Sequence, residues 1–277
     1  MSRKAQVGDG PKTATRSEQW DFEGAHGDRL SGRLELPRDM PPRALALFAH
    51  CFTCGKDGLA AARIARALAQ RGIGVLRFDF TGIGASGGEF AHTDFTSNVA
   101  DLVRAAEALS ERLSAPGLLV GHSLGGAAAL AAAARVPGVR AVATIGAPSH
   151  PGHVRRQVPE ADRARILREG AAEVLLAGRP FRIGQGFLDD VADQPQRERI
   201  AALPVPLLVL HSPEDELVDP AEAREIHSLA PGHASLVWLH GADHLLTVRE
   251  DAARVADVVA AWATPLLDAP GRPVGTD

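Results

Sequence analysis

The sequence predicts an α/β fold with a mostly parallel central sheet, helices on both faces and a small inserted lid. Short, almost continuously apolar runs alternate with longer segments that carry apolar residues at helical spacing. Such alternation implies right-handed crossovers, which place helices on both faces of a parallel sheet. One interval, residues 149–203, separates two predicted strands by far more than a crossover requires, and it is therefore expected to cover a site.

The apolar runs have the length of strands buried on both faces. They occupy residues 44–50, 74–80, 117–123, 141–148, 206–212 and 235–241. Ahead of them, "EQWDFEGAHGDRLSGRLELP" reads as two strand-like pieces around a Gly-rich turn, which predicts an antiparallel hairpin. Helices are predicted between the runs, and Gly72 follows the first of them in the position of a C-cap.

The predicted domain organisation is one α/β core interrupted by the insertion. The core comprises residues 19–148 and 204–264, and residues 149–203 form the lid. Within the lid, "AEVLLAGRPFRI" predicts a small hairpin that turns at Gly178. The polar, Pro- and Gly-containing ends, residues 1–18 and 265–277, are predicted to be flexible tails.

Composition and charge exclude several classes of partner. A net charge of −4 and a complete lack of tyrosine argue against nucleic acid, and the charge also argues against an anionic membrane. No apolar run approaches a membrane span or a signal-peptide core, so a cytoplasmic protein is expected. A small molecule is the expected partner, and the sequence carries no sign of the oligomeric state.

The pentapeptide "GHSLG", residues 121–125, joins an apolar strand to a small-residue helix. This G-x-S-x-G pattern in a strand–turn–helix context is typical of a nucleophile elbow, in which a sharp turn lifts the serine above the sheet. Glycine is expected at residues 121 and 125 because larger side chains there would collide with neighbouring backbone. Ser123 is therefore predicted to be a nucleophile rather than an inert serine in a tight turn.

A serine nucleophile needs a base, and the base needs an orienting carboxylate, in the chain order Ser, acid, His. "LLVLHSPEDELVD" places carboxylates after one strand, and "LHGADHLL" places His244 after the next. Asp215 is favoured as the acid and Asp219 comes second. His244 is favoured over His240, which is interpreted as structural. The remaining acidic candidates are Glu214 and Glu216.

No metal site is predicted. His150 and His153 form a pair at the start of the lid, but they lack the carboxylate or thiolate neighbours expected of metal ligands.

With these residues in view, the chain resembles the α/β-hydrolases. "AHCFTCGKDG" is similar to the oxyanion loop of small-lidded esterases, and the hairpin-bearing lid resembles that of bacterial cinnamoyl or feruloyl esterases. "HCFTC", "LRFDFTGIGASGG", "GHSLGGAA", "ATIGAP", "GRPFRI", "FLDD" and "GADHLLT" resemble the hydrolase half of bacterial α/β-hydrolase/OsmC-like fusion proteins. The likeness covers roughly residues 20 to 264.

The resemblance implies a serine esterase with the triad Ser123, Asp215 and His244, and it implies no cofactor. The backbone N–H groups of Phe52 and Leu124 would form the oxyanion hole. Because the lid is small, short or aromatic acyl groups are expected. An acyltransferase or a cofactor-free perhydrolase with the same triad, and a redox-responsive binding module, are the alternatives.

Cys51 and Cys54 are the only cysteines, and they stand where relatives in the wider fold often have glycine. Two cysteines on a loop are too few for a zinc site. Two interpretations stay open: each is a small buried side chain that fills space, or the two form a redox pair whose oxidation disturbs the oxyanion hole.

Overall fold

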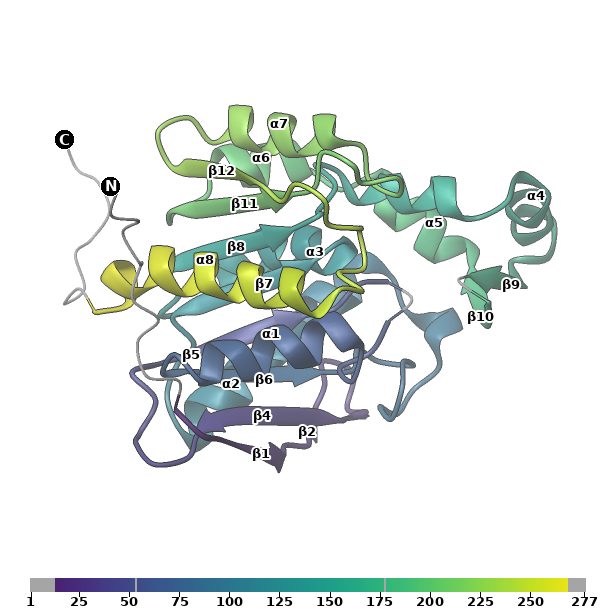
Figure 1. Ribbon diagram of the computed structural model, residues 1–277. Helices are drawn as coiled ribbons and strands as arrows, with labels where there is room; N and C mark the ends of the chain where they lie inside the picture. Colours follow the sequence, from purple (N-terminus) through teal and green to yellow (C-terminus); the bar gives the residue numbers. More distant parts are fainter. Residues whose placement is uncertain (1–12, 53, 177, 269–277) are drawn as a thin grey trace.

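The computed structural model describes residues 13–52, 54–176 and 178–268 of the chain (Figure 1). Its centre is an eight-stranded sheet in the order β1-β4-β6-β5-β7-β8-β11-β12. Within this sheet, β6, β5, β7, β8, β11 and β12 pair in parallel, and β4 and β1 add an antiparallel edge. The predicted mostly parallel α/β fold is thereby confirmed. The sheet strands are β1 (Thr15–Gln19), β4 (Gly32–Pro37), β5 (Ala44–Ala49), β6 (Ile73–Phe78), β7 (Leu118–His122), β8 (Ala141–Ile145), β11 (Leu207–His211) and β12 (Ala234–Trp238).

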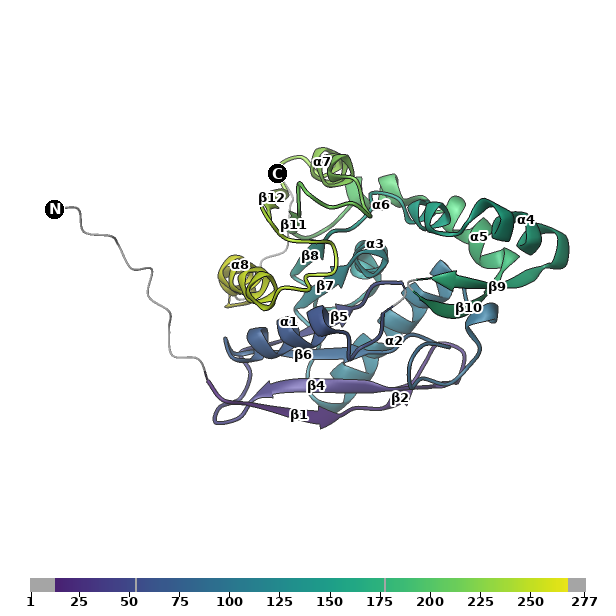
Figure 2. The same ribbon diagram turned by 45° about the vertical axis from the view of Figure 1, so that its right-hand side comes forward.

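The central strands are apolar at every position because both of their faces are covered. Successive side chains of β5 alternate between two cores: Leu47 belongs to one, and Ala46 and Phe48 belong to the other. Helices α1 (Leu59–Ala69) and α8 (Arg249–Asp268) cover one face, and α2 (Phe95–Arg112), α3 (Leu124–Ala132) and α7 (Pro220–Leu229) cover the other. Figure 2 shows the two helical layers with the sheet between them.

The N-terminal antiparallel elements are arranged as two nested pairs. Strands β2 (Phe22–Glu23) and β3 (Arg29–Leu30) form a small hairpin, and β1 pairs with β4 outside it. Residues 15–18, expected in a flexible tail, belong to β1, and residues 265–268, also expected in a tail, belong to α8. These tail boundaries were wrong because β-pairing and helix packing extend to residues whose own sequence is polar or contains proline. Residues 1–12 and 269–277 lie outside the described residues.

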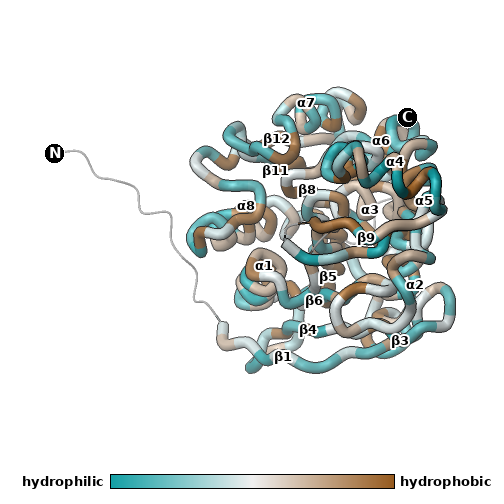
Figure 3. The backbone as a smooth tube through the Cα atoms, turned by 90° about the vertical axis from the view of Figure 1, so that its right-hand side faces the viewer, coloured by the Kyte–Doolittle hydropathy of each residue, from teal (hydrophilic) through white to brown (hydrophobic). Residues whose placement is uncertain are grey.

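The segment between β8 and β11 contains its own small elements. They are the 3₁₀ helix η3 (Pro151–Gln157), α4 (Glu160–Glu169), β9 (Ala171–Leu176), β10 (Arg179–Gly184), α5 (Gln185–Ala192) and α6 (Gln196–Ala201). Strands β9 and β10 pair antiparallel around Gly178, whose φ of 76° suits glycine. Figure 3 looks onto this end of the molecule, where β9 crosses in front of the central strands.

Polar contacts fasten this segment to the core helices. On α5, Asp190 accepts hydrogen bonds from the N–H and the hydroxyl of Thr96 on α2, at 2.9 and 2.8 Å. On α6, the buried Gln196 side chain donates to the Ala127 carbonyl of α3 at 2.9 Å. The segment is therefore seated on the same helical layer that carries the Ser123 turn.

Among the helices of residues 13–268 that the structure describes, none is long and apolar enough to cross a membrane.

Candidate active site

Ser123 lies on the turn between β7 and α3, with φ of 56° and ψ of −126°. A positive φ is strained for a residue with a side chain, and it is the backbone feature of a nucleophile elbow. The Ser123 N–H donates to the Ile145 carbonyl at the end of β8, at 2.9 Å, which ties the turn to the sheet. The hydroxyl is thus held at the carboxyl edge of the sheet, directly at the N-terminus of α3.

The glycines around Ser123 are required by close backbone approach. A Cβ on Gly121 would lie 2.3 Å from the Gly125 carbonyl oxygen. One on Gly125 would lie 2.3 Å from the Ala49 carbonyl oxygen and 2.4 Å from that of His50. These contacts bring the first turn of α3 against the end of β5, so the Ser123 turn and the loop after β5 are neighbours.

Asp215 and His244 meet at the same edge of the sheet. They follow β11 and β12, and the Asp215 Oδ2 atom lies 2.7 Å from the His244 Nδ1 atom. The other oxygen of Asp215 accepts the N–H groups of Leu217 and Val218, both at 2.9 Å. Burial alone would raise the pKa of Asp215, but the hydrogen bond and charge of His244 and these N–H groups outweigh it, so the pKa is lowered. Asp215 is therefore an ionised, fully bonded carboxylate that fixes the His244 ring.

The other candidates from the same loops have different surroundings. Asp219 caps α7 by accepting the N–H of Ala221 at 2.8 Å. Glu214 is exposed and accepts the N–H of Gly241 at 3.1 Å. Glu216 is exposed. His240 lies beyond the end of β12 with 74% of its side chain exposed, so it is not the structural histidine within the strand that was expected.

His244 is positioned by two residues whose role was not predicted from the sequence. His122 precedes Ser123, and its Nε2 atom lies 2.7 Å from the His244 carbonyl oxygen, to which it donates. Burial, then the proximity of His244, lowers the pKa of His122 to about 4, which keeps this imidazole neutral. A Cβ on Gly146 would lie 3.2 Å from His244 Nδ1 and 3.3 Å from Asp215 Oδ2. These roles are made by tertiary contacts, and only the place of His122 within "GHSLG" hinted at one of them.

The loop after β5 brings the Phe52 backbone beside α3. Neither the Phe52 N–H nor the Leu124 N–H has a hydrogen-bond partner within the described parts of the chain. Two free backbone donors beside a strained serine are the arrangement that an oxyanion hole needs. His50, which opens the loop, is buried; burial is the main reason that its pKa is lowered, and its Nδ1 lies 2.7 Å from the Cys51 carbonyl oxygen.

A buried ionic network supports the second half of this loop. The Lys56 ammonium lies 2.8 Å from the Asp79 carboxylate, and both side chains are buried. Asp79 also accepts the N–H groups of Lys56, at 2.6 Å, and Ala85, at 3.0 Å. Since a buried carboxylate with these partners is costly to displace, the network holds the loop after β5 against the loop after β6.

Cys51 and Cys54 are joined by a disulfide, with Cα atoms 5.2 Å apart. Neither is therefore a free thiol that only fills space. The Cys54 N–H donates to the Cys51 carbonyl at 3.1 Å, which closes a turn. Thr53, between them, lies outside the described residues.

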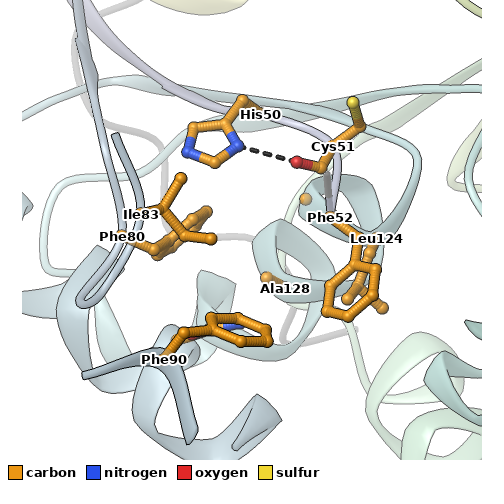
Figure 4. A pocket seen from close by; sticks show the side chains of 10 residues that line it. His50, Cys51, Phe52, Phe80, Ile83, Phe90, Leu124 and Ala128 are labelled. Atoms are coloured by element: carbon orange, nitrogen blue, oxygen red, sulfur yellow. Dashed lines mark hydrogen bonds between the residues drawn. The ribbon is translucent and has the colours of Figure 1, made fainter. Parts of the chain in front are cut away.

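An aromatic cluster connects the loop to the inserted segment, and Figure 4 shows two of its rings, those of Phe52 and Phe90. The ring of Phe52 stacks on Phe187 of α5, with centroids 5.0 Å apart, and on Phe181 of β10, at 6.4 Å. Phe90 packs against all three rings. Behind Phe52 only about 10 Å³ of free space remains, lined in part by Phe80, Ile83, Leu124 and Ala128. The Phe52 side chain is therefore clamped between core and insertion.

A wider cleft of about 880 Å³ opens in front of the loop. Residues following the strands of the site line it: Cys54 and Gly55 after β5, Leu217 beside Asp215, and Leu245 beside His244. The insertion contributes Gln157, Leu175, Leu176 and Arg179. A molecule in this cleft would contact both the proposed catalytic loops and the insertion, and it would meet leucine side chains together with the charged side chains of Lys56, Asp57, Asp79 and Arg179.

His150 and His153 are occupied by hydrogen bonds at the start of the insertion. His150 accepts the Gly152 N–H at 3.1 Å and contacts the Gln194 carbonyl at 3.0 Å. His153 contacts the Leu217 carbonyl at 2.8 Å, and its other nitrogen lies 3.7 Å from Glu222. In the described part of the chain no three His, Cys, Asp or Glu side chains are grouped as metal ligands.

Comparison with known proteins identifies the family. The esterase domain of a Rhodothermus marinus protein is similar in structure with a TM-score of 0.75, is 45% identical, and aligns over 90% of this chain and 98% of that domain. The chain belongs to the α/β-hydrolase superfamily. It is an esterase-like member of that superfamily, and the pattern of the family described as "Serine aminopeptidase, S33" matches residues 41–169.

More distant relatives align over most of the chain. The monoacylglycerol lipase of Mycolicibacterium smegmatis is 26% identical over 90% of this chain and 98% of its own length. Est1E of Butyrivibrio proteoclasticus, solved with ferulic acid bound, has a TM-score of 0.74 at 18% identity, with 90% of this chain and all of that chain covered. This last likeness concerns the fold alone.

Proposed function

We propose that this α/β-hydrolase is a serine esterase that cleaves carboxylic esters through an acyl-enzyme. The observation that carries the proposal is the 2.7 Å contact between Asp215 and His244 at the sheet edge where the strained Ser123 turn lies. In this arrangement Asp215 keeps a proton on Nδ1 of His244, so that Nε2 is free to take the proton of the Ser123 hydroxyl. Each of these roles is a proposal that the geometry supports.

The reaction follows from these roles. The Ser123 oxygen attacks the ester carbonyl as His244 takes the proton of the Ser123 hydroxyl. The oxyanion that forms accepts hydrogen bonds from the N–H groups of Phe52 and Leu124. His244 then gives the proton to the departing alcohol. Water, deprotonated by His244, attacks the acyl-enzyme and releases the acid and Ser123.

The expected substrates are esters of short or aromatic acids. The aromatic cluster around Phe52 leaves about 10 Å³ behind the loop, so no acyl chain can extend into that region. A solved relative of the same fold holds ferulic acid, an aromatic acid. A second candidate is a monoacylglycerol, because leucines line the open cleft and one relative is a monoacylglycerol lipase.

The test of the proposal is covalent labelling by a fluorophosphonate together with turnover of a p-nitrophenyl ester. Ser123→Ala should lose the label and reduce kcat by about 10⁴- to 10⁶-fold, because the nucleophile is removed. Ser110→Ala is the matched control: the Ser110 hydroxyl donates to the Ala106 carbonyl on the same helix, at 2.7 Å, and the variant should behave as wild type. If Ser123→Ala keeps a tenth of the wild-type turnover, Ser123 is not the nucleophile.

A further inference from the structure

The disulfide encloses the proposed oxyanion donor. Phe52 lies between Cys51 and Cys54 in the chain. The bond between the two cysteines closes a small covalent ring that includes the backbone carrying the Phe52 N–H. They are the only cysteines among the 277 residues. Any thiol chemistry of this protein must therefore take place on the loop that holds the proposed oxyanion hole.

The two sulfur-bearing residues differ in access. Cys51 is buried, with 4% of its surface exposed, and its side chain points away from the pocket of Figure 4. Cys54 is only half-buried and lines the 880 Å³ cleft, which Cys51 does not, whereas both cysteines line a neighbouring cavity of about 180 Å³ beside Leu59 and Leu245. A thiol entering the cleft therefore reaches Cys54 first.

Positive charge is available where such a thiol would arrive. Arg179, on β10, lines the same cleft and has no carboxylate partner within the described residues; its guanidinium lies 5.5 Å from the centre of the Phe181 ring. Its charge also acts at the loop, where it contributes to lowering the pKa of His50, after burial and the charge of Lys56. Lys56 differs from Arg179 in being paired with the carboxylates of Asp79 and Asp57. Since a thiolate is the attacking form of a thiol, Arg179 favours its approach.

We propose that the Cys51–Cys54 disulfide is a site of thiol–disulfide exchange that accepts electrons from dithiols. A dithiol's thiolate attacks the Cys54 sulfur, and the electron pair of the Cys51–Cys54 bond leaves on the Cys51 sulfur, which takes a proton. The second thiol of the dithiol then attacks the mixed disulfide, releases Cys54 as a thiol and leaves as a cyclic disulfide. Two electrons pass from the dithiol to the protein, and a disulfide-class oxidant reverses the reaction.

Exchange at this site alters ester hydrolysis, a consequence that rests on the proposed function. With the bond intact, the Phe52 N–H has no hydrogen-bond partner among the described residues, and the loop is held at both cysteines. Reduction removes the covalent constraint on the backbone that aims this N–H, while the Phe52 ring stays clamped by Phe181 and Phe187. Because an oxyanion donor acts mainly in the transition state, kcat should fall and KM should change little.

The experiment reduces the purified full chain with dithiothreitol and follows two readouts in parallel. Free thiols are counted by alkylation and intact mass, and ester turnover is measured on the same samples. Both cysteines should become alkylated, and circular dichroism should show that the fold stays intact. Over the same time course kcat should fall at least about tenfold, towards the 10²- to 10³-fold expected for a lost oxyanion donor, and it should recover on reoxidation.

Single variants separate the disulfide from other effects of the reductant. Cys54→Ser should have the low kcat of reduced wild type and no response to dithiothreitol. Arg179→Gln should slow the reduction of wild-type cysteines severalfold, whereas Arg182→Gln on the same strand, which does not line the cleft, should not. Equal rates in these two variants would overturn the role of Arg179.

The outcomes distinguish this inference from the proposed function. If the thiols appear and kcat is unchanged, or rises, the disulfide does not hold the oxyanion donor in its working position. If no thiols appear in the folded protein, the exchange site itself is refuted. If the protein has no esterase activity in either state but exchanges thiols rapidly, the proposed function fails and the exchange site stands.

Discussion

At the scale of single residues, the bonding of Asp215 distinguishes it from the neighbouring carboxylates. Its two oxygens together contact His244, Leu217 and Val218, and the side chain is almost completely buried. Asp219, four positions later, uses its carboxylate to cap a helix. A helix cap tolerates asparagine, because its amide oxygen accepts the same hydrogen bond. A carboxylate that selects the tautomer of a histidine does not tolerate replacement by asparagine.

Asp215→Asn is accordingly expected to lower kcat by about 10⁴-fold, because an amide that donates to Nδ1 would stabilise the wrong tautomer of His244. Asp219→Asn should stay within a few-fold of wild type. In the same assay His244→Ala should abolish turnover and His240→Ala, at an exposed position, should not. Steady-state ester hydrolysis measures all of these variants, and the reverse ranking of either pair would reassign the residue.

The residues of the site differ in how far sequence alone reveals them. Ser123, Asp215 and His244 each follow a predicted strand, so their meeting at one sheet edge could be expected, and their roles stay predictions. Gly146 and His122 could not be assigned in this way. What they do depends on the position of His244, which is more than a hundred residues away from His122 and reaches it only in the folded chain.

At the scale of elements, the inserted segment is held to the core by an ion pair at its start. Glu222 of α7 lies beside His153 of η3 and accepts both the N–H and the hydroxyl of Ser149, at 2.9 and 2.6 Å. The interaction with His153, followed by the bonds from Ser149, lowers the pKa of Glu222 to about 2 against the cost of burial. The same interaction raises the pKa of His153.

Glu222→Gln should therefore lower the free energy of unfolding by up to about 3 kcal/mol near neutral pH. The lowered pKa of Glu222 means that its contribution is complete above its ordinary pKa of 4.5 and is lost as pH falls towards about 2. The raised pKa of His153 means that its share is complete below 6.5 and is lost as pH rises through the raised value. Denaturant unfolding at several pH values measures the difference between wild type and variant.

A difference that stays constant as pH falls from about 4.5 towards 2 would contradict the electrostatic explanation. Glu225→Gln is an informative companion, since Glu225 also contacts the Ser149 hydroxyl, at 2.8 Å, but lies outside the His153 pair.

The elements themselves were largely predictable because their periodicity is strong. The apolar runs became β5, β6, β7, β8, β11 and β12, and the "AEVLLAGRPFRI" hairpin became β9 and β10. The start of β1 was missed: the expected strand-like piece begins at Glu18, whereas β1 begins at Thr15. The polar "TRSEQ" lies at the sheet edge, where pairing with β4 rather than burial makes it a strand.

At the scale of the whole molecule, core and insertion together shape the space available to a substrate. The insertion presses Phe181 and Phe187 onto Phe52, so the region behind the oxyanion loop is nearly full. The open cleft on the other side is large, but it is bordered by leucines that are partly exposed to water, among them Leu217 and Leu245. Such a shape suits a compact apolar acyl group better than an extended chain.

A series of p-nitrophenyl esters should accordingly give the highest kcat/KM for short or aromatic acyl groups. Each added methylene that finds no enclosed pocket adds little binding free energy, so the rate should level off or fall along the series. A kcat/KM that still climbs beyond about ten acyl carbons would favour the monoacylglycerol alternative, because it would require the chain to lie buried along the leucines.

The order of the strands has a consequence for partly folded molecules. The proposed catalytic groups follow β5, β7, β11 and β12, and β12 is the outermost strand of its side of the sheet. An edge strand has a neighbour on one side only, so it is the easiest to detach. Detachment of β12 would carry away His244 while the rest of the sheet stayed paired. Catalysis in this molecule therefore depends on the pairing of its edge strand β12. A population in which β12 is detached can give an almost fully folded spectroscopic signal and still be inactive.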